Sequence, residues 1–241
     1  MFITNAAGGL NPLYNVGDIV CIMDHLCIPM MAGHNPLMGP NDAELGPRFP
    51  PMSNAYDDNL QSLVMDSARR LEMEYKVRPN GVYCFVSGPM YESKAECRYL
   101  RSVGGDAVGM STIPEIAAAH HSGMKVLCLS VITNKVVITD GQEAANHEEV
   151  LDAVNQCSQQ IQALITDIIV NSKSYLQSLP DLPTILPCKE DELAVSSSGG
   201  CKSRSCPKPE KFFGIPFHCL LMGTCMLTVG ASMAVLMLRK R

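Results

Sequence analysis

The sequence lacks the patterns that mark several large classes of protein. Its eleven cysteines include no CxxC pair and no Cys/His spacing suited to zinc, so neither a CxxC redox centre nor a metal site is expected. It also has no block of Lys and Arg within its first 200 residues, and its net charge is -5. The missing basic block and the negative net charge argue against nucleic acid as a partner.

The opening residues lack the features of a secretory signal. No basic segment precedes an apolar stretch, and no small-residue cleavage site follows. Most cysteines stand singly inside apolar runs, as at Cys21, Cys84 and Cys128, where a reduced thiol behaves as a small hydrophobe. We therefore expect the globular part of the chain to face the cytosol.

What the sequence does contain is an alternation of strand and helix patterns. Short runs rich in Val and Ile, bounded by Gly, Asn or Pro, are typical of buried strands. The predicted strands cover residues 18–23, 81–86, 106–110 and 125–133. Apolar residues at helical spacing predict helices over 60–71 and 150–168. Alternating strands and helices indicate an α/β domain.

A linker separates this domain from a hydrophobic tail. Helical periodicity stops near Leu179, and prolines and a Ser-Gly run take over, as is typical of a flexible segment. The predicted organisation is a globular domain at 1–176, a linker at 177–211 and a tail at 212–241.

The tail has the length and composition of a membrane anchor. No Asp, Glu, Lys or Arg occurs between Lys211 and Arg239, and Phe217–Leu238 would extend about 33 Å as a helix, enough for a bilayer core of about 30 Å. A buried core helix is the alternative, which the preceding linker and the final basic residues disfavour. We expect one C-terminal transmembrane helix that anchors the chain to a membrane.

Eight short motifs occur in one order along the first 150 residues. They are Asn5-Ala-Ala-Gly-Gly-Leu-Asn-Pro, Gly39-Pro-Asn-Asp, Gly46-Pro-Arg-Phe-Pro, Ser53-Asn-Ala-Tyr-Asp, Ser87-Gly-Pro-Met-Tyr-Glu-Ser, Asp106-Ala-Val-Gly-Met-Ser-Thr-Ile-Pro-Glu, Ile132-Thr-Asn-Lys and Asn146-His-Glu-Glu-Val. Over about residues 2–175 the series resembles the trimeric purine nucleoside phosphorylases that prefer 6-oxopurines. The resemblance implies an α/β fold with a mixed central sheet flanked by helices.

The resemblance also implies a reaction. Members of this family use inorganic phosphate to cleave (deoxy)inosine and (deoxy)guanosine to a free base and a pentose 1-phosphate, in purine salvage. The departing purine carries negative charge, so the site should offer hydrogen bonds that strengthen in the transition state. Phosphate is itself the nucleophile, so the reaction needs no activated Ser or Cys and no cofactor.

Two residues match the family's base-recognition and catalytic positions. Asn134 follows the predicted strand 125–133, and its amide would bond the N7 and O6 edge of the purine. Glu92 would accept hydrogen bonds from N1 and N2 of a 6-oxopurine. Tyr91, where the family more often has Phe, would pack against the base. Without the resemblance, Asn134 is equally typical of a turn at a strand end.

Further matches concern the sugar and the phosphate. Asn5, Ala6, Val108, Met110 and His147 correspond to substrate-binding positions. The Ala6 backbone N–H and Ser111 correspond to phosphate ligands. Taken alone, Met110 would be a core residue, and Ser111 a helix N-cap ahead of Pro114.

Phe49 corresponds to an aromatic residue that reaches the sugar site of a neighbouring subunit, so the resemblance implies a homotrimer. The alternative is a loop hydrophobe that binds nothing. His120 and His121 lie in a predicted helix without ligand spacing, and we assign them no role.

The resemblance starts inside the family domain. The sequence has no counterpart of the family's early Gly-Ser-Gly-Leu-Gly loop or of its Gly-Arg-Phe-His-Met-Tyr-Glu-Gly segment, which supply most phosphate ligands. We expect a sheet that is incomplete at the N-terminus, with exposed edges, and activity near background for the chain as given.

Two alternatives to an active enzyme of this type stay open. One is a catalytically inactive, membrane-anchored protein that binds nucleosides or other proteins. The other is a methylthioadenosine phosphorylase, a related family that generally has Asp in place of Asn134, as suits a 6-amino purine.

Overall fold

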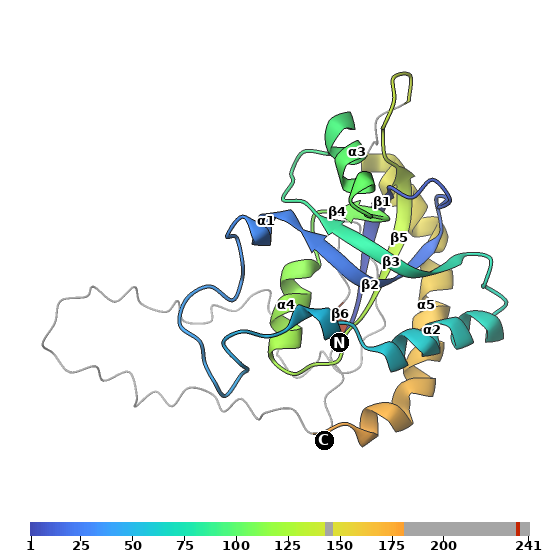
Figure 1. Ribbon diagram of the computed structural model, residues 1–241. Coiled ribbons are helices and arrows are strands. Elements are labelled where there is room, and N and C mark those ends of the chain that lie inside the picture. The colour runs from blue at the N-terminus through green and yellow to red at the C-terminus, as the bar shows by residue number, and fades with distance from the viewer. Residues whose placement is uncertain (143–146, 181–234, 237–241) are drawn as a thin grey trace, which may run out of the picture. The chain divides into compact units, whose positions relative to one another are not determined.

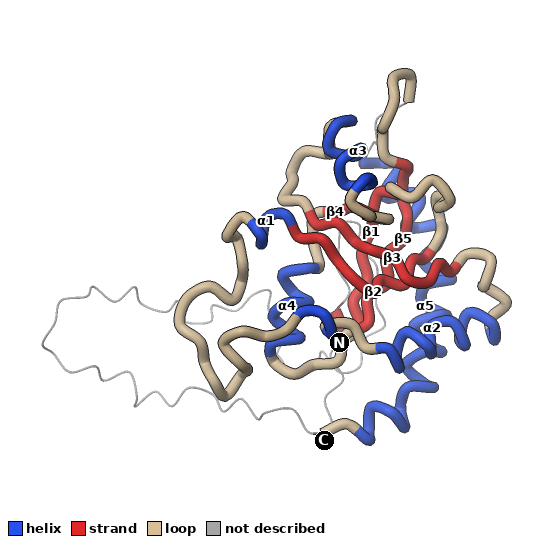
Figure 2. Tube along the Cα trace, in the orientation of Figure 1, coloured by secondary structure: helices blue, strands red, loops and turns tan. Residues whose placement is uncertain are grey.

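The computed structural model describes residues 1–142, 147–180 and 235–236, which belong to one compact unit formed by residues 1–183 and 231–241. Strands form the centre of this unit and helices lie around them (Figures 1 and 2). The strands are β1 (Phe2–Gly9), β2 (Ile19–Cys27), β3 (Val77–Phe85), β4 (Ala107–Gly109), β5 (Leu127–Lys135) and β6 (Val235–Leu236). The helices are α1 (Ile28–Met31), the 3-10 turn η1 (Met52–Asn54), α2 (Asp58–Arg70), α3 (Lys94–Ser102), α4 (Ile113–His121) and α5 (His147–Ser178).

The sheet is mixed and closes on itself. Its order is β4-β3-β2-β5-β1-β6, with a further pairing between β4 and β1. β1 and β5 are parallel, as are β2 with β3 and β3 with β4, whereas β2 runs antiparallel to β5 and β4 antiparallel to β1. The three residues of β4 therefore pair with both β3 and β1 and close a ring of β4, β3, β2, β5 and β1, with β6 outside it on β1. The fold predicted from the resemblance, a mixed sheet flanked by helices, is confirmed.

The expectation of exposed sheet edges is corrected at β4. In place of an open edge there, Gly8 and Gly9 of β1 pair with Val108 and Ala107 of β4. Near the start of β1, Phe2 and Ile3 pair with β6. Pairing at these positions satisfies backbone N–H and C=O groups that would otherwise face solvent.

The small residues from Ala6 to Gly9 form the end of strand β1. At its end β1 is bordered on both sides, because Gly8 pairs with Asn134 of β5 and with Val108 of β4. The small residues thus serve close strand packing rather than a free loop.

The helices cover the sheet by burying apolar faces. α2 and α5 lie side by side (Figure 1), and Leu60, Val64, Leu164 and Ile168 form one core cluster with residues of β1, β2 and β5. α4 contributes Ile113 and Ile116 to a second cluster, and α3 contributes Cys97 and Leu100 to a third. These helices fix the positions of the strand ends that carry the candidate site.

A buried carboxylate joins three elements away from those ends. Asp57 caps α2 by accepting from the Leu60 N–H at 3.0 Å, and it accepts from the Tyr175 hydroxyl of α5 at 2.6 Å. Lys125, just before β5, lies 3.3 Å from the same carboxylate. The hydrogen bonds from Tyr175, Leu60 and Lys125 outweigh the effect of burial and hold the pKa of Asp57 below its ordinary value.

The loop between α1 and η1 is fastened to the end of α4. His121 Nε2 lies 3.0 Å from Asn41 Oδ1, and His120 Nε2 lies 2.9 Å from the Pro51 carbonyl. Asn41 Nδ2 also donates to the Gly46 carbonyl at 3.0 Å. The two histidines, to which we assigned no role from their spacing, therefore hold this loop.

The predicted linker and tail lie mostly outside the described residues. α5 continues through Ser178, so the first two residues of the predicted linker are helical. Of the predicted membrane span, only Val235 and Leu236 are described, and they form strand β6 rather than helix. No helix in the described ranges is long and apolar enough to cross a bilayer.

Candidate functional site

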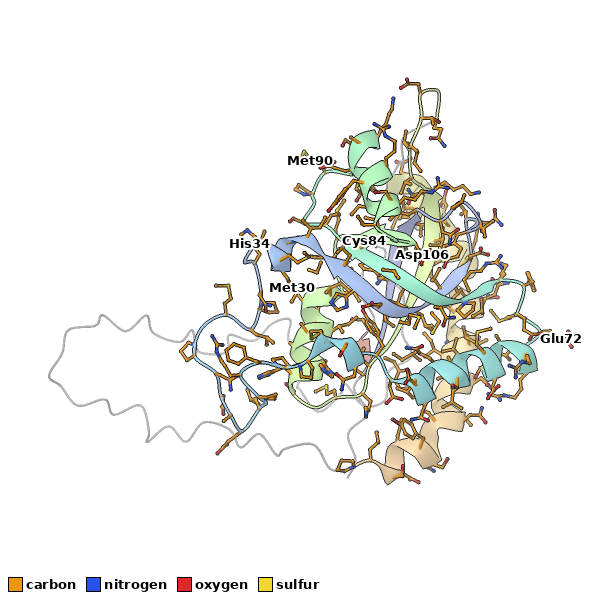
Figure 3. All side chains as sticks on the ribbon, viewed as in Figure 1. Met30, His34, Glu72, Cys84, Met90 and Asp106 are labelled. Carbon is orange, nitrogen blue, oxygen red and sulfur yellow. The ribbon has the colours of Figure 1, made fainter. Side chains whose placement is uncertain are left out.

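The ends of four strands meet where most of the predicted site residues lie. Gly8 of β1 stands between Asn134 of β5 and Val108 of β4. Phe85, the last residue of β3, pairs with Gly109, the last residue of β4. Figure 3 labels Cys84 in β3, Asp106 directly before β4 and Met90 on the loop that leads from β3 to α3.

Asn134 is held by its neighbour on β5. The Thr133 hydroxyl lies 3.2 Å from Asn134 Oδ1 and 3.4 Å from the Ala7 carbonyl, so it can donate to either oxygen. This contact orients the amide through its oxygen. The half-buried Asn134 keeps an NH₂ group that can donate to a ligand.

Glu92 lies on the β3–α3 loop beside the third core cluster. Burial raises the pKa of its carboxyl group, opposed by a backbone hydrogen bond, and the nearby charge of Glu96 raises it further. Burial raises the pKa of Cys84 to about 12 and that of Cys97 to about 11. The nearby Glu92 charge adds to both shifts. Cys84 and Cys97 belong to the same core cluster as Val108, and Asn134 lies on the other side of Gly8 from Val108.

The β3–α3 loop also contacts the end of β4. Gly88 has φ +64°, and a Cβ atom there would lie 2.5 Å from Met110 Sδ. Glycine at this position lets the loop approach Met110 closely. Tyr91, on the same loop, is 48% exposed, so its ring is accessible to a ligand.

A second group of polar residues joins β1 to the start of α4. Asn5 Nδ2 donates to Thr112 Oγ1 at 2.9 Å, and the Ser111 and Thr112 hydroxyls are 3.1 Å apart. Ala6 is exposed, and its carbonyl lies close to Gly109. The predicted sugar and phosphate residues Asn5, Ala6, Met110 and Ser111 therefore gather at this end of the sheet.

The reading of Ser111 as a helix N-cap is wrong. α4 begins at Ile113, so the N-cap position falls on Thr112, which makes no side-chain capping bond. Thr112 is fully buried and has φ +86°, a region that β-branched residues rarely adopt. No sequence signal marks this residue, because Thr before Ile-Pro is an ordinary helix start.

Two predicted site residues are not joined to this group. Phe49 is 86% exposed in the loop fastened to the far end of α4, where the Arg48 guanidinium lies 5.7 Å from its ring centre. The side chain of His147, the first residue of α5, lies outside the described residues.

Neither a metal centre nor a deep pocket stands out in the described part of the chain. Its His, Cys, Asp and Glu side chains form no group of three placed to hold a metal. A shallow hollow of about 480 Å³ is lined by α5 residues between Gln159 and Val170, and none of the predicted site residues line it. The candidate site is thus defined by the strand ends and not by this hollow.

Comparison with known proteins identifies the family. The sequence profile of the phosphorylase superfamily matches residues 1–170. The purine nucleoside phosphorylase of Bos taurus is 45% identical over 167 residues, which cover 69% of this chain and 57% of the relative. Purine nucleoside phosphorylase 1 of Bacillus subtilis is 43% identical over 170 residues, which cover 70% and 60%.

Solved structures give the same result. Schistosoma mansoni purine nucleoside phosphorylase in complex with inosine superimposes with a TM-score of 0.68 and 40% identity, covering 75% of this chain and 61% of the other. The chain thus spans about three fifths of the length of the relatives it matches. The profile match over residues 1–170, most of the chain, shows that the chain belongs to the phosphorylase superfamily.

Proposed function

We propose that this chain acts in the phosphorolysis of 6-oxopurine nucleosides, releasing hypoxanthine or guanine and a pentose 1-phosphate. The observation that carries the proposal is the meeting of the ends of β1, β4 and β5 beside Asn134, with the β3–α3 loop that carries Glu92 packed against Met110 at the end of β4. Relatives at 43–45% identity are purine nucleoside phosphorylases, and solved relatives hold inosine and guanosine.

The proposed chemistry assigns a role to each group. A phosphate oxygen attacks the anomeric carbon as the bond from that carbon to the purine nitrogen breaks, and the bonding electrons leave with the base. The Asn134 amide donates to the base as negative charge reaches it, which stabilises the transition state more than the ground state. Glu92 accepts from the N–H groups of a 6-oxopurine, and these bonds would compensate its partial burial.

The sugar and the phosphate would lie against the second group of polar residues. Met110 packs on the loop that carries Glu92, so it can line the sugar beside the base. Ser111 and the Ala6 backbone would face the phosphate. The site thus offers a base end at Asn134 and an anion end at Ser111, separated by the end of β4.

The experiment measures base binding and turnover separately on the full chain. Hypoxanthine affinity is measured by calorimetry, and phosphate-dependent release of hypoxanthine from inosine is measured by a coupled assay. Binding together with turnover supports the proposal. Binding without turnover supports the alternative of an inactive nucleoside-binding protein, and absence of both rejects the base site.

We also propose that the chain forms a homotrimer in which Phe49 reaches a neighbouring copy. Phe49 is exposed, and the Arg48 contact and the bonds from α4 hold its loop away from the base site of its own chain. Light scattering after size exclusion should give a mass of three chains. A monomer with full activity would reject the proposal.

A further proposal concerns the membrane. The uncharged stretch from Phe217 to Leu238 is long enough to cross a bilayer, whereas pairing of β6 with β1 would keep part of it on the folded unit. If the stretch anchors the chain, its deletion should release the protein from carbonate-washed membranes. A chain that is released by carbonate with the stretch intact is not anchored by it.

A further inference from the structure

Thr112 combines three features that rarely occur together. It is fully buried, it is β-branched, and its backbone has φ +86° and ψ -45°. Backbone strain of this kind persists only where the surrounding structure enforces it, and it is most common at functional sites. The question is what the strained conformation does at the start of α4.

The conformation turns the Thr112 hydroxyl away from the helix. At an ordinary N-cap a threonine oxygen accepts from a backbone N–H of the first helical turn, but Thr112 makes no such bond. Its Oγ1 instead lies 2.9 Å from Asn5 Nδ2 and 3.1 Å from Ser111 Oγ. The strain therefore places the hydroxyl between β1 and Ser111.

The direction of these hydrogen bonds follows from the donors available. Asn5 Nδ2 carries only hydrogens, so it donates to Thr112 Oγ1. The single hydroxyl hydrogen of Thr112 is then free to point at Ser111 Oγ, which can accept it. Ser111 keeps its own hydrogen for a third group.

Tyr83, on β3, lies beside this group. Burial is the main cause of the raised pKa of its hydroxyl, and among the described residues that hydroxyl has no hydrogen-bond partner. The side-chain neighbour behind Ser111 is thus Thr112, and with Thr112 donating from behind, the Ser111 hydroxyl is best placed to donate outward.

We propose that Asn5 and Thr112 are positioning residues that form a one-way hydrogen-bond relay, which aims the Ser111 hydroxyl hydrogen at an oxygen of bound phosphate. This inference rests on the proposed function, because it assigns the anion end of that site to Ser111. It differs from the sequence expectation for Asn5, which was direct contact with substrate. Donors in a chain polarise one another, so the relay strengthens the final bond to an anion.

The test compares inorganic phosphate binding with hypoxanthine binding in the full chain. Thr112→Val keeps the branched shape and removes the hydroxyl, so it should weaken phosphate binding by about tenfold or more, as expected for loss of support to a charged hydrogen bond. Thr112→Ser keeps the hydroxyl and should restore phosphate affinity to within about threefold of wild type. Hypoxanthine affinity should stay the same in both, since the relay does not touch the base end.

Two further variants complete the experiment. Asn5→Ala removes the first donor and should reproduce the phosphate defect of Thr112→Val, which keeps the test decisive if the valine variant does not fold. Ser172→Ala removes a buried hydroxyl of α5 that bonds the Ile169 carbonyl, and it should change neither affinity.

The outcomes separate the relay from the proposed function. Equal phosphate affinity in wild type and Thr112→Val, or parallel loss of phosphate and hypoxanthine binding, overturns the relay. Wild type that binds no phosphate overturns it as well. Phosphate and hypoxanthine binding with no turnover of inosine overturns only the proposed reaction.

Discussion

At the scale of single residues, Asn134 is the most direct test of base choice. An amide can donate to the purine, whereas a carboxylate accepts from a 6-amino group. In a complete protein that carries this segment, Asn134→Asp should therefore lower kcat/KM for inosine by about a hundredfold, the cost of one lost donor at developing charge, and move the preference toward adenosine. The measurement is kcat/KM for both nucleosides.

Turnover, and not binding, is the necessary readout in that experiment. A solved relative holds adenosine as well as inosine, so occupancy of the site by adenosine does not reveal preference. Lys135→Ala is a matched control, because this exposed neighbour follows Asn134 on the same strand. An unchanged preference in Asn134→Asp would remove Asn134 from base recognition.

The sequence predicted which residues gather at the site better than it predicted how they are held. Asn134, Met110 and Ser111 were singled out through their motifs, and the structure places them at or just after neighbouring strand ends, whereas Glu92 lies on the loop that packs against Met110. Their roles stay predictions. Thr112 could not have been found, because its importance lies in a backbone angle that the fold imposes and that Thr itself disfavours.

At the scale of elements, the Asp57 carboxylate ties α2 to α5. Because the pKa of Asp57 is lowered in the folded state, its stabilising effect is present above the ordinary pKa and is lost as pH falls through the folded-state value. Tyr175→Phe should cost about 1.5–3 kcal/mol at neutral pH, typical of a hydrogen bond to a charged group. The difference from wild type should shrink in acid.

Urea unfolding at several pH values measures this effect. Tyr75→Phe removes a tyrosine hydroxyl from a side chain that is 64% exposed, and it should leave stability unchanged at every pH. A Tyr175→Phe penalty that does not vary with pH would mean that the hydroxyl acts independently of the Asp57 charge.

Gly46 controls the loop that carries Phe49. A Cβ atom at this position would lie 1.9 Å from the His121 carbonyl oxygen, so Gly46→Ala must push the loop away from α4. Overpacking of this kind costs about 1–3 kcal/mol locally. Hydrogen exchange should speed up in the loop and stay slow in β5.

Met38→Ala is the control for the loop. This residue lies in the same segment but is 68% exposed, so its exchange pattern should match wild type. If Gly46→Ala also leaves loop exchange unchanged, the fastening by His120 and His121 is not what orders the loop.

Two elements show where sequence patterns reach their limit. β1 was not among the predicted strands, since Ala7, Gly8 and Gly9 are typical of a loop, yet small residues here let strands approach on both sides. α3 was not predicted, although Ser93 and Glu96 form a capping box at its start. Long-range pairing explains the first miss, and a local signal left unused explains the second.

At the scale of the whole unit, α5 stabilises the sheet through one buried face. Leu164 is fully buried in the cluster shared with α2, β1, β2 and β5, so Leu164→Ala should cost about 2–5 kcal/mol. Val170, on the same helix, is 67% exposed, and Val170→Ala should change stability by no more than about 0.5 kcal/mol. The free energy of unfolding in urea measures both.

Comparable small losses in the two variants would mean that α5 is not integral to the core. That outcome would also contradict the predicted domain boundary near 176, since the sequence placed this helix inside the globular part. The closed order of strands, by contrast, had no sequence signal: the strand at 106–110 was predicted, but its pairing with β1 joins residues far apart in the chain.

The strained backbone of Thr112 also bears on how the chain would respond to laboratory evolution. Glycine adopts φ +86° without the penalty of about 1–3 kcal/mol that a strained residue carries. A library randomised at position 112 and sorted for thermal stability alone should admit glycine, whereas the same library sorted for phosphate capture should retain threonine or serine. The two selections would enrich different residues at position 112, as expected where a residue is retained for function although it lowers stability.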